Sequence, residues 1–513
     1  MLKIKLFLSI FVLFSLTLSN STVNANEFKS NKLHIKFDNQ KAKVLNWKIL
    51  NKSMKTPHDL IQENISSFGL DGTIDGFQLD YWVNQAGGWN IDKTSDELSF
   101  YLKSENIPFE LNKYWKFYED SYIVDLSYEL IPKKNLSNTE LYLTLGPGIG
   151  EKPIGDLGIA ESSYSFTELI YKTKEIKTKK LEDKKEVFLL NQNNSLKWVG
   201  LHSRYFLFLL KTNDNFSNIE LNIDQINNDK NISLDSSLKI NLPYTDLKKD
   251  EIYESSFQLF TGTKTKNDLM TAELDDILFQ SLWGWMRYIV LGIMVLLYWI
   301  NDFIFNWGIS IIILSILVRI VIHPIAKKSL QSQHEFAKIQ EIIQPKIKEI
   351  KEKYKGGEQS ERILNIYEKY NISPLGSLKP LIGLAIQIPI FIALFHLLGQ
   401  TFELKEASFL WIESLAEPDK FLMLGKSIPF FGNYFNLLPV LMSLTNLLSI
   451  KLSSANSTYN KSDIKQNIGL GLMTIAFFLL FYSFPSGMVL YWTMANLLHL
   501  GYSLITLKKN HNH

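Results

Sequence analysis

The stretch WGISIIILSILVRIVI, residues 307–322, decides the fold class because it reads as a membrane-spanning helix. Arg319 is its only charged residue. An arginine near the middle of a spanning helix costs about 2.5–3.5 kcal/mol on insertion scales. Two arrangements offset this cost: the side chain reaches the nearby membrane surface, or it faces a wet cavity inside a helical bundle. Pro324 follows five residues later and leaves both arrangements open.

The charges of this 513-residue chain are divided unevenly along it. Residues 26–275 carry 31 Lys and Arg against 37 Asp and Glu, whereas the remainder carries 23 against 15. This division is typical of an extracytoplasmic domain joined to a membrane domain with basic cytoplasmic loops. The chain contains no cysteine, which excludes disulfides and thiolate metal sites.

The N-terminal residues 1–25 have the pattern of an export signal. Lys3 and Lys5 precede an apolar run over residues 6–18, and small residues surround Ala25. Thirteen apolar residues are too few for a typical span and suit the core of a signal peptide. We expect cleavage after Ala25, with an uncleaved signal anchor as the alternative; both place the following residues outside the cytoplasm.

Residues 26–275 favour β structure. Alternating or β-rich runs such as LHIKF (33–37), YIVDLSYEL (122–130) and RYFLFLL (204–210) are separated by clusters of Asn, Asp, Gly and Pro. Many short strands predict a large antiparallel sandwich. No grouping of residues suits hydrolysis, phosphate binding or metal binding. We therefore expect no enzyme activity, metal, cofactor or direct nucleic-acid binding.

Charged residues decide which segments of the helical region from residue 277 onward are predicted to cross the membrane. The segment 282–300 is long enough to cross, but it contains Arg287 and many interfacial Trp and Tyr residues. If it crossed, the segment 327–371 would lie outside the cytoplasm. That segment carries ten Lys and Arg against seven Asp and Glu, and basic loops favour the cytoplasmic side. We therefore expect an interfacial helix at 277–304, then a core at 305–508 and a tail at 509–513. The five predicted spans are 307–322, 378–398, 435–450, 468–484 and 488–505.

The segment 325–371 is predicted to form a cytoplasmic helical hairpin. Ile339, Ile343 and Ile347 recur at helical spacing, and the pair Gly356-Gly357 separates a first arm from a second that resumes at 362–370. Pro345 is expected to kink or restart the first arm. A structural loop and a docking surface for other proteins both remain open.

Several blocks of the chain resemble the YidC-type membrane protein insertases of the Oxa superfamily. The outer domain does so more loosely, through KWVGLHSRYF (197–206) and LDDILFQSLWGW (274–285). The stronger blocks are NWGISIIILSILVRIVIHPIAKKSLQSQ (306–333), IQPKIKEIKEKY (343–354), ISPLGSLKPLIGLAIQIPIFIALFHLL (372–398), FLWIESLAEPD (409–419) and FPSGMVLYWTMANLL (484–498).

The resemblance implies an α+β membrane protein with a five-helix transmembrane core and a periplasmic β-supersandwich related to sugar-binding sandwiches. The family's hydrophilic groove opens to the cytoplasm and the lipid and is closed on the outside. It receives hydrophobic segments of nascent membrane proteins and releases them into the bilayer, alone or beside the Sec translocon. The implied location is the bacterial inner membrane, multi-pass; the ribosome and the signal recognition particle pathway are further candidate partners.

The resemblance also implies roles for single residues. Arg319 matches the groove arginine, which favours the wet-cavity arrangement. Trp492 stands where the family usually has a tyrosine, so an aromatic contact is expected without the hydroxyl. Taken alone, each of these residues suits ordinary packing or lipid contact. The polar groove positions are Ser315 and Gln387, and the apolar slide for substrates is Ile388, Phe391, Leu480 and Trp492.

Other classes of protein remain as alternatives. A secondary transporter needs a midplane substrate site and usually an internal repeat, and no matching halves are visible. A membrane-anchored carbohydrate-binding or carbohydrate-processing protein would place its acid and base in the sandwich, where no pair stands out. A structural assembly factor is a further alternative. The cleavable N-terminus and the apolar helix 277–304 both depart from the family's usual pattern.

Overall fold

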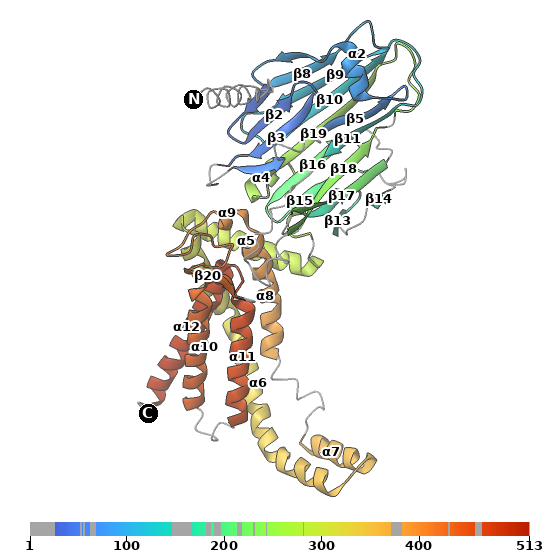
Figure 1. Ribbon diagram of the computed structural model, residues 1–513. Coiled ribbons are helices and arrows are strands. Elements are labelled where there is room, and N and C mark those ends of the chain that lie inside the picture. Colours follow the sequence, from blue (N-terminus) through green and yellow to red (C-terminus); the bar gives the residue numbers. More distant parts are fainter. Residues whose placement is uncertain are drawn as a thin grey trace, which may run out of the picture. The chain divides into compact units, whose positions relative to one another are not determined.

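A computed structural model of the chain describes residues 26–511 apart from 52–53, 55–56, 62–67, 146–166, 181–185, 189–195, 213–217, 229–230, 243, 281, 371–381, 429–430 and 457–463. The predicted signal segment lies outside the described residues. The described chain divides into two compact units, a sheet-rich unit up to Ile277 and a helical unit from Leu278 (Figure 1).

The sheet-rich unit contains three antiparallel sheets. The largest has the strand order β13 (Ile176–Lys180), β12 (Thr167–Lys172), β15 (Trp198–Ser203), β16 (Phe206–Thr212), β19 (Tyr253–Thr263), β10 (Ile123–Pro132), β9 (Phe109–Phe117), β8 (Glu97–Leu102) and β7 (Asn90–Lys93). The second has the order β14 (Glu186–Phe188), β17 (Asn218–Asn228), β18 (Asn231–Asn241), β11 (Glu140–Leu145), β5 (Gly69–Ile74) and β6 (Phe77–Gln78). The third is β1 (Asn26–Lys29), β2 (Leu33–Asp38), β3 (Lys43–Ile49) and β4 (His58–Ile61). The short helices are α2 (Leu79–Ala86), α4 (Lys266–Thr271) and η2 (Asp275–Ile277).

The predicted antiparallel β domain is confirmed, and its alternating sequence pattern explains its core. Along β10 every second side chain is buried, so one face of the strand packs inward. Trp47 on β3 contacts Trp115 on β9, with ring centroids 6.3 Å apart. Phe68 lies 5.5 Å from Trp47 and 5.4 Å from Phe208 on β16. These rings join the small sheet to the largest one.

One charged residue breaks the apolar pattern of this core. Lys113 on β9 is 1% exposed and points inward. Its Nζ lies 4.4 Å from the centroid of the Trp89 ring and 3.5 Å from the carbonyl oxygen of Ala42. Burial, together with the nearby charge of Lys43, lowers the pKa of Lys113 to about 7.

The helical unit begins with a sharp turn between its first two helices. The chain leaves the first helix at Phe305, where φ is 54°, and Asn306 Oδ1 accepts a hydrogen bond from the Ile309 N–H at 3.0 Å. The elements are α5 (Gly284–Ile304), α6 (Trp307–Lys353), α7 (Gly357–Lys369), α8 (Ile382–Gln400), α9 (Phe402–Lys405), β20 (Leu422–Ile428), β21 (Gly432–Phe435), α10 (Leu437–Asn456), α11 (Ile464–Phe481) and α12 (Ser486–His511).

The long helices pack against one another over much of their length (Figure 1). Helix α12 contacts α6, α8 and α10, and α10 contacts α11. Among the described residues, Gly284–Ile304 and Trp307–Ile325 are each long and apolar enough to cross a bilayer. All five predicted spans overlap described helices, but the number of crossings stays a prediction.

The structure corrects the expected boundaries of the hairpin arms. Helix α6 continues through both Pro324 and Pro345 to Lys353, so Pro345 does not restart the first arm, whereas a kink at Pro345 stays a prediction. Both prolines lie on exposed positions, where solvent or headgroups can satisfy the carbonyl that each leaves unbonded. The second arm begins at Gly357 rather than at 362, because Glu358 and Arg362 form an ion pair at 3.0 Å across its first turn.

The helix predicted at 277–304 begins later than expected. Residues Asp275–Ile277 form a 3₁₀ turn, and α5 starts at Gly284. One stripe of α5, including Val290 and Leu297, is buried, while Trp285, Tyr288 and Trp299 on other faces are exposed. Whether α5 lies in the interface or crosses the membrane stays a prediction.

Replacing Lys113 by methionine should stabilise the sheet-rich unit most at low pH. The pKa of Lys113 is about 7 in the folded protein and 10.5 in the unfolded chain. Below pH 7 the lysine is charged in both states, so folding carries the whole free-energy cost of burying the charge. This cost falls as the pH rises towards 10.5. Lys113→Met should therefore raise the unfolding free energy by on the order of 5 kcal/mol at pH 6 and by much less at pH 10.

Thermal unfolding of both proteins at the two pH values measures this difference. Lys116→Met, on the outward face of the same strand, is the matched control and should change little at either pH. An equal gain from Lys113→Met at pH 6 and pH 10 would contradict the assignment.

Candidate functional site

Arg319 is partly exposed on the apolar half of α6 and lies beside α12. Its charge is close enough to act on both Tyr491 and His499 of α12. These two residues are eight positions apart, about 12 Å along one helix face, so the guanidinium lies alongside that stretch of α12. Within the part of the chain that the structure describes, Arg319 makes no ion pair with an acidic side chain.

Polar side chains connect helices α10, α11 and α12. Asn446 on α10 donates from Nδ2 to Thr474 Oγ1 on α11 at 3.2 Å. Asn496 on α12 donates from Nδ2 to the carbonyl of Met442 on α10 at 3.4 Å. Thr474 is 3% exposed. Sequence reasoning missed Asn446, Thr474 and Asn496, although each is a polar residue inside a predicted span.

The two predicted polar groove residues differ in their surroundings. Ser315, one turn before Arg319, is fully buried, and its Oγ donates to the carbonyl of Ile312 at 2.8 Å. Its hydroxyl is thus occupied by its own helix. Gln387 on α8 is partly exposed. Their roles in a groove stay predictions.

Two of the four predicted slide residues meet in an aromatic cluster. The Phe391 ring on α8 lies 5.4 Å from the Trp492 ring on α12 and 5.8 Å from the Phe481 ring on α11. The other two are on the surface of the same helices: Ile388 is 47% exposed and Leu480 is 45% exposed. The four residues thus belong to three helices that meet at these rings.

A loop covers one end of the helical unit, which we call the sealed end. The Ser486 and Gly487 N–H groups donate to the carbonyls of Glu417 and Leu415 at 2.7 and 2.8 Å, and residues 481–491 are all buried. A side chain on Gly308 would overlap the ring of Phe409. The loop 409–417 is therefore seated directly on the ends of α6 and α12.

Asp419 holds this seal to the start of α10. Its carboxylate accepts hydrogen bonds from the N–H groups of Leu437 and Leu438 at 2.9 and 3.0 Å and from Trp411 Nε1 at 3.0 Å. Burial raises the pKa of Asp419, and these hydrogen bonds oppose that rise. The carboxylate thus satisfies donors that the first turn of α10 leaves unbonded.

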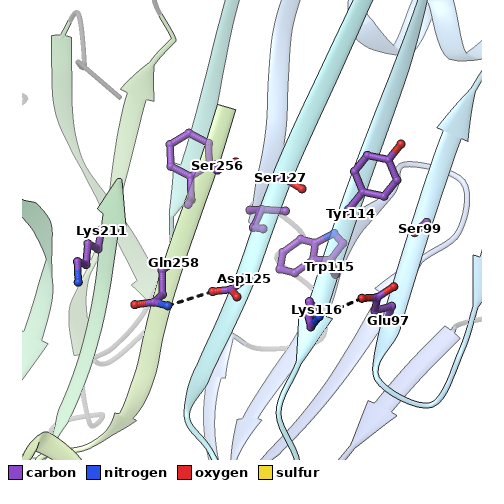
Figure 2. A pocket seen from close by; sticks show the side chains of 12 residues that line it. Glu97, Ser99, Tyr114, Trp115, Lys116, Asp125, Ser127, Lys211, Ser256 and Gln258 are labelled. Atoms are coloured by element: carbon purple, nitrogen blue, oxygen red, sulfur yellow. Dashed lines mark hydrogen bonds and ion pairs between the residues drawn. The ribbon is translucent and has the colours of Figure 1, made fainter. Parts of the chain in front are cut away.

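The sheet-rich unit has a polar hollow of about 580 Å³ on the outer face of its largest sheet (Figure 2). Its two carboxylates are both engaged. Glu97 pairs with Lys116 at 3.4 Å, and Asp125 accepts from Gln258 Nε2 at 3.2 Å and from the Tyr118 hydroxyl at 2.6 Å.

A second polar cluster lies inside this unit and escaped sequence reasoning. His202 Nε2 is 3.4 Å from Glu168 Oε2, and Lys264 Nζ is 3.3 Å from His202 Nδ1. Burial lowers the pKa of His202 to about 4 and that of Lys264 to about 8. The side chains of His202 and Glu168 are at most 10% exposed, whereas Lys264 is partly exposed.

The chain thus combines an antiparallel β domain with an apolar helical domain in which Arg319 is partly exposed beside α12. Two family models match these domains: one described as "YidC periplasmic domain" over residues 42–305, and one described as "60Kd inner membrane protein" over residues 299–513. Because the first model covers more than half of the chain, the protein belongs to the YidC family.

Relatives described as "Membrane protein insertase YidC" match parts of the chain. The chain is 32% identical to that of Syntrophobacter fumaroxidans over 257 residues and 34% identical to that of Aquifex aeolicus over 251 residues. Each match covers about half of this chain and 44% of the relative. The relative from Methylobacillus flagellatus is 26% identical over 85% of this chain and 73% of its own length. A solved structure titled as an active YidC insertase is 16% identical and covers 98% of this chain and 99% of its own, with a TM-score of 0.36.

Replacing Asp419 by alanine should loosen the sealed end, because two backbone N–H groups and one indole N–H lose a buried acceptor. We expect a loss of about 1–3 kcal/mol of stability, measured as a lower melting temperature of the purified protein in detergent. Asp419→Asn, which keeps an acceptor oxygen, should lose less. Ser408→Ala, an exposed change in the same loop, is the control; equal melting temperatures for all four proteins would contradict the role of Asp419.

Proposed function

We propose that this protein is a membrane protein insertase. It receives apolar segments of newly made proteins in a wet, cytoplasm-open groove beside Arg319 and releases them into the lipid. The observation that carries this proposal is the position of Arg319: on an apolar helix, partly exposed, next to α12, and without an acidic partner among the described residues. Membership of the YidC family supports it.

The physical role of Arg319 is electrostatic attraction. A fixed positive charge surrounded by apolar helices is screened less than one in bulk water, so it attracts negative charges over a longer distance. Acidic residues in the polar N-terminal segment of a substrate would be drawn towards it. A wet recess at that depth also shortens the hydrocarbon path that the polar segment has to cross.

The sealed end gives the proposed groove its direction. Hydrogen bonds from Ser486 and Gly487 fasten the loop 409–417 over the ends of α6 and α12, and we place this end on the periplasmic side. Lys327 and Lys328 on α6 and Lys451 on α10 follow the apolar runs of their helices at the opposite end, which suits the cytoplasm. The protein is thus proposed to be a multi-pass protein of the inner membrane with its β domain in the periplasm.

Release into lipid would follow from the substrate's own apolar surface, which gains roughly 25 cal/mol per Å² when it leaves water. The exposed Ile388 and Leu480, next to the rings of Phe391 and Trp492, offer an apolar path from the groove to the bilayer. No nucleotide chemistry is required. The Sec translocon, the ribosome and the signal recognition particle pathway are proposed partners, with the exposed arm α7 as a candidate contact.

Removing the charge at Arg319 should reduce insertion of substrates whose N-terminal segment is acidic. In proteoliposomes without ATP, Arg319→Ala should slow insertion of a short single-span substrate at least tenfold, about 1.4 kcal/mol, as measured by protease protection. Arg319→Lys should retain much of the activity. Arg319→Glu should be inactive with the acidic substrate and regain activity when the substrate's acidic residues are changed to lysine.

Lys328→Ala, an exposed change further along the same helix, is the matched control and should insert at the normal rate. Normal insertion by both Arg319→Ala and Arg319→Glu, with either substrate, would rule out the proposed role of the charge. Saturable uptake of a small solute by the same vesicles would instead favour a transporter.

The apolar path predicts where a substrate is found during insertion. Because the chain has no cysteine, a photoreactive crosslinker can be attached at any single introduced cysteine. Ile388→Cys and Leu480→Cys should crosslink to a stalled nascent chain. Leu447→Cys on α10, where the native side chain is 46% exposed, is the matched control and should contact lipid only. Equal crosslinking at the three positions would argue against a defined path.

A further inference from the structure

The hairpin of β20 and β21 carries an apolar surface that the described residues of the helical unit leave exposed. Phe421, Leu422, Met423 and Ile428 are between 43% and 67% exposed, and Leu410 nearby is 75% exposed. Single exposed apolar residues are common on protein surfaces, but a contiguous group on one hairpin is not. A strand with exposed apolar side chains in water would also be prone to aggregate, so this surface needs a partner.

The surroundings of the hairpin identify the chemistry of that partner. The ring of Trp411 lies 6.1 Å from that of Phe421, while its Nε1 donates to Asp419. Lys420 Nζ lies 5.6 Å from the centroid of the Tyr434 ring and pairs with Glu417 at 2.7 Å. Tryptophan, tyrosine and lysine around an apolar surface are the residues that gather where hydrocarbon meets lipid headgroups.

The hairpin is also continuous with surfaces that face lipid in the proposed function. The β20–β21 hairpin lies at the end of the helical unit where α12 begins, away from helix α7 (Figure 1). The helices below it expose further large apolar side chains, among them Leu472 and Leu480 on α11. A bilayer that covers those helices would meet the hairpin at its surface.

We propose that the β20–β21 hairpin lies in the periplasmic interface of the bilayer, with Phe421, Leu422 and Met423 at the boundary of the acyl chains. The inference rests on the proposed function only for the membrane and its orientation. The phospholipid interface is thus proposed to cover the apolar surface of the hairpin. The β domain and a second copy of the chain are the alternatives that the test distinguishes.

This placement fixes the depth of Arg319. The loop residues Trp411 and Phe409 connect the hairpin to the start of α6, because Trp411 contacts Phe421 and Phe409 is seated on Gly308. Arg319 follows Gly308 by eleven residues, which rise about 16 Å along the helix. In a hydrocarbon layer about 30 Å thick, the arginine then lies just past the middle, in the cytoplasmic leaflet.

Fluorescence quenching by lipids tests the placement. Met423→Cys, labelled with an environment-sensitive nitrobenzoxadiazole dye and reconstituted in vesicles, should be quenched at least twofold more by lipids spin-labelled near the headgroup than by lipids labelled deep in the acyl chain. Leu472→Cys, equally exposed but in the middle of α11, should show the opposite preference. Lys103→Cys, on the surface of the β domain, should be quenched by neither.

Three results would overturn the proposal. If the dye at position 423 is quenched by neither lipid and emits like the dye at Lys103→Cys, the hairpin lies in water. A blue-shifted emission without lipid quenching places it against protein. Stronger quenching by the deep label places it within the hydrocarbon. Insertion assays on the same labelled vesicles separate the two proposals, because normal insertion with an unquenched hairpin would reject only the lipid contact.

Discussion

The account depends on the cost of holding one guanidinium among apolar helices. A charge moved from water into a dry interior loses several kcal/mol of solvation after relaxation, and an acidic partner or water has to replace it. Arg319 has no acidic partner among the described residues and remains partly exposed. In the proposed function, water solvates the guanidinium at this depth. A charged, wet recess inside a bilayer is also what a protein needs in order to attract a polar segment across the membrane.

In the proposed function, the two ends of the helical unit would make the recess one-sided. At one end, Asp419, Ser486 and the closely packed Gly308 fasten loops over the helices, so polar groups there are satisfied by the protein itself. At the other end, α6 continues for about 30 residues beyond its apolar part, and its exposed arm holds α7 through a cation–π contact between Arg362 and Tyr354 at 4.1 Å. A substrate entering from the second end would meet Arg319 before it reached the seal.

The sequence alone predicted the features that depend on local periodicity and on isolated charges. Alternating residues indicated the β domain, and the single arginine in residues 307–322 indicated the candidate site. It did not predict that α6 passes through Pro324 and Pro345, because that depends on where the freed carbonyls point. The links Asn446–Thr474 and Glu168–His202–Lys264 join residues distant in sequence, so only the folded chain brings them together.

The most direct test asks whether position 319 is wet and whether its charge is what matters. Arg319→Cys should react with a water-soluble aminoethyl methanethiosulfonate at a rate near that of the exposed Lys328→Cys, whereas the fully buried Leu314→Cys should not react. The reaction restores a positive charge, so insertion should recover, and a neutral reagent of similar size should not restore it. An unreactive cysteine at position 319, or equal recovery with the neutral reagent, would contradict the account.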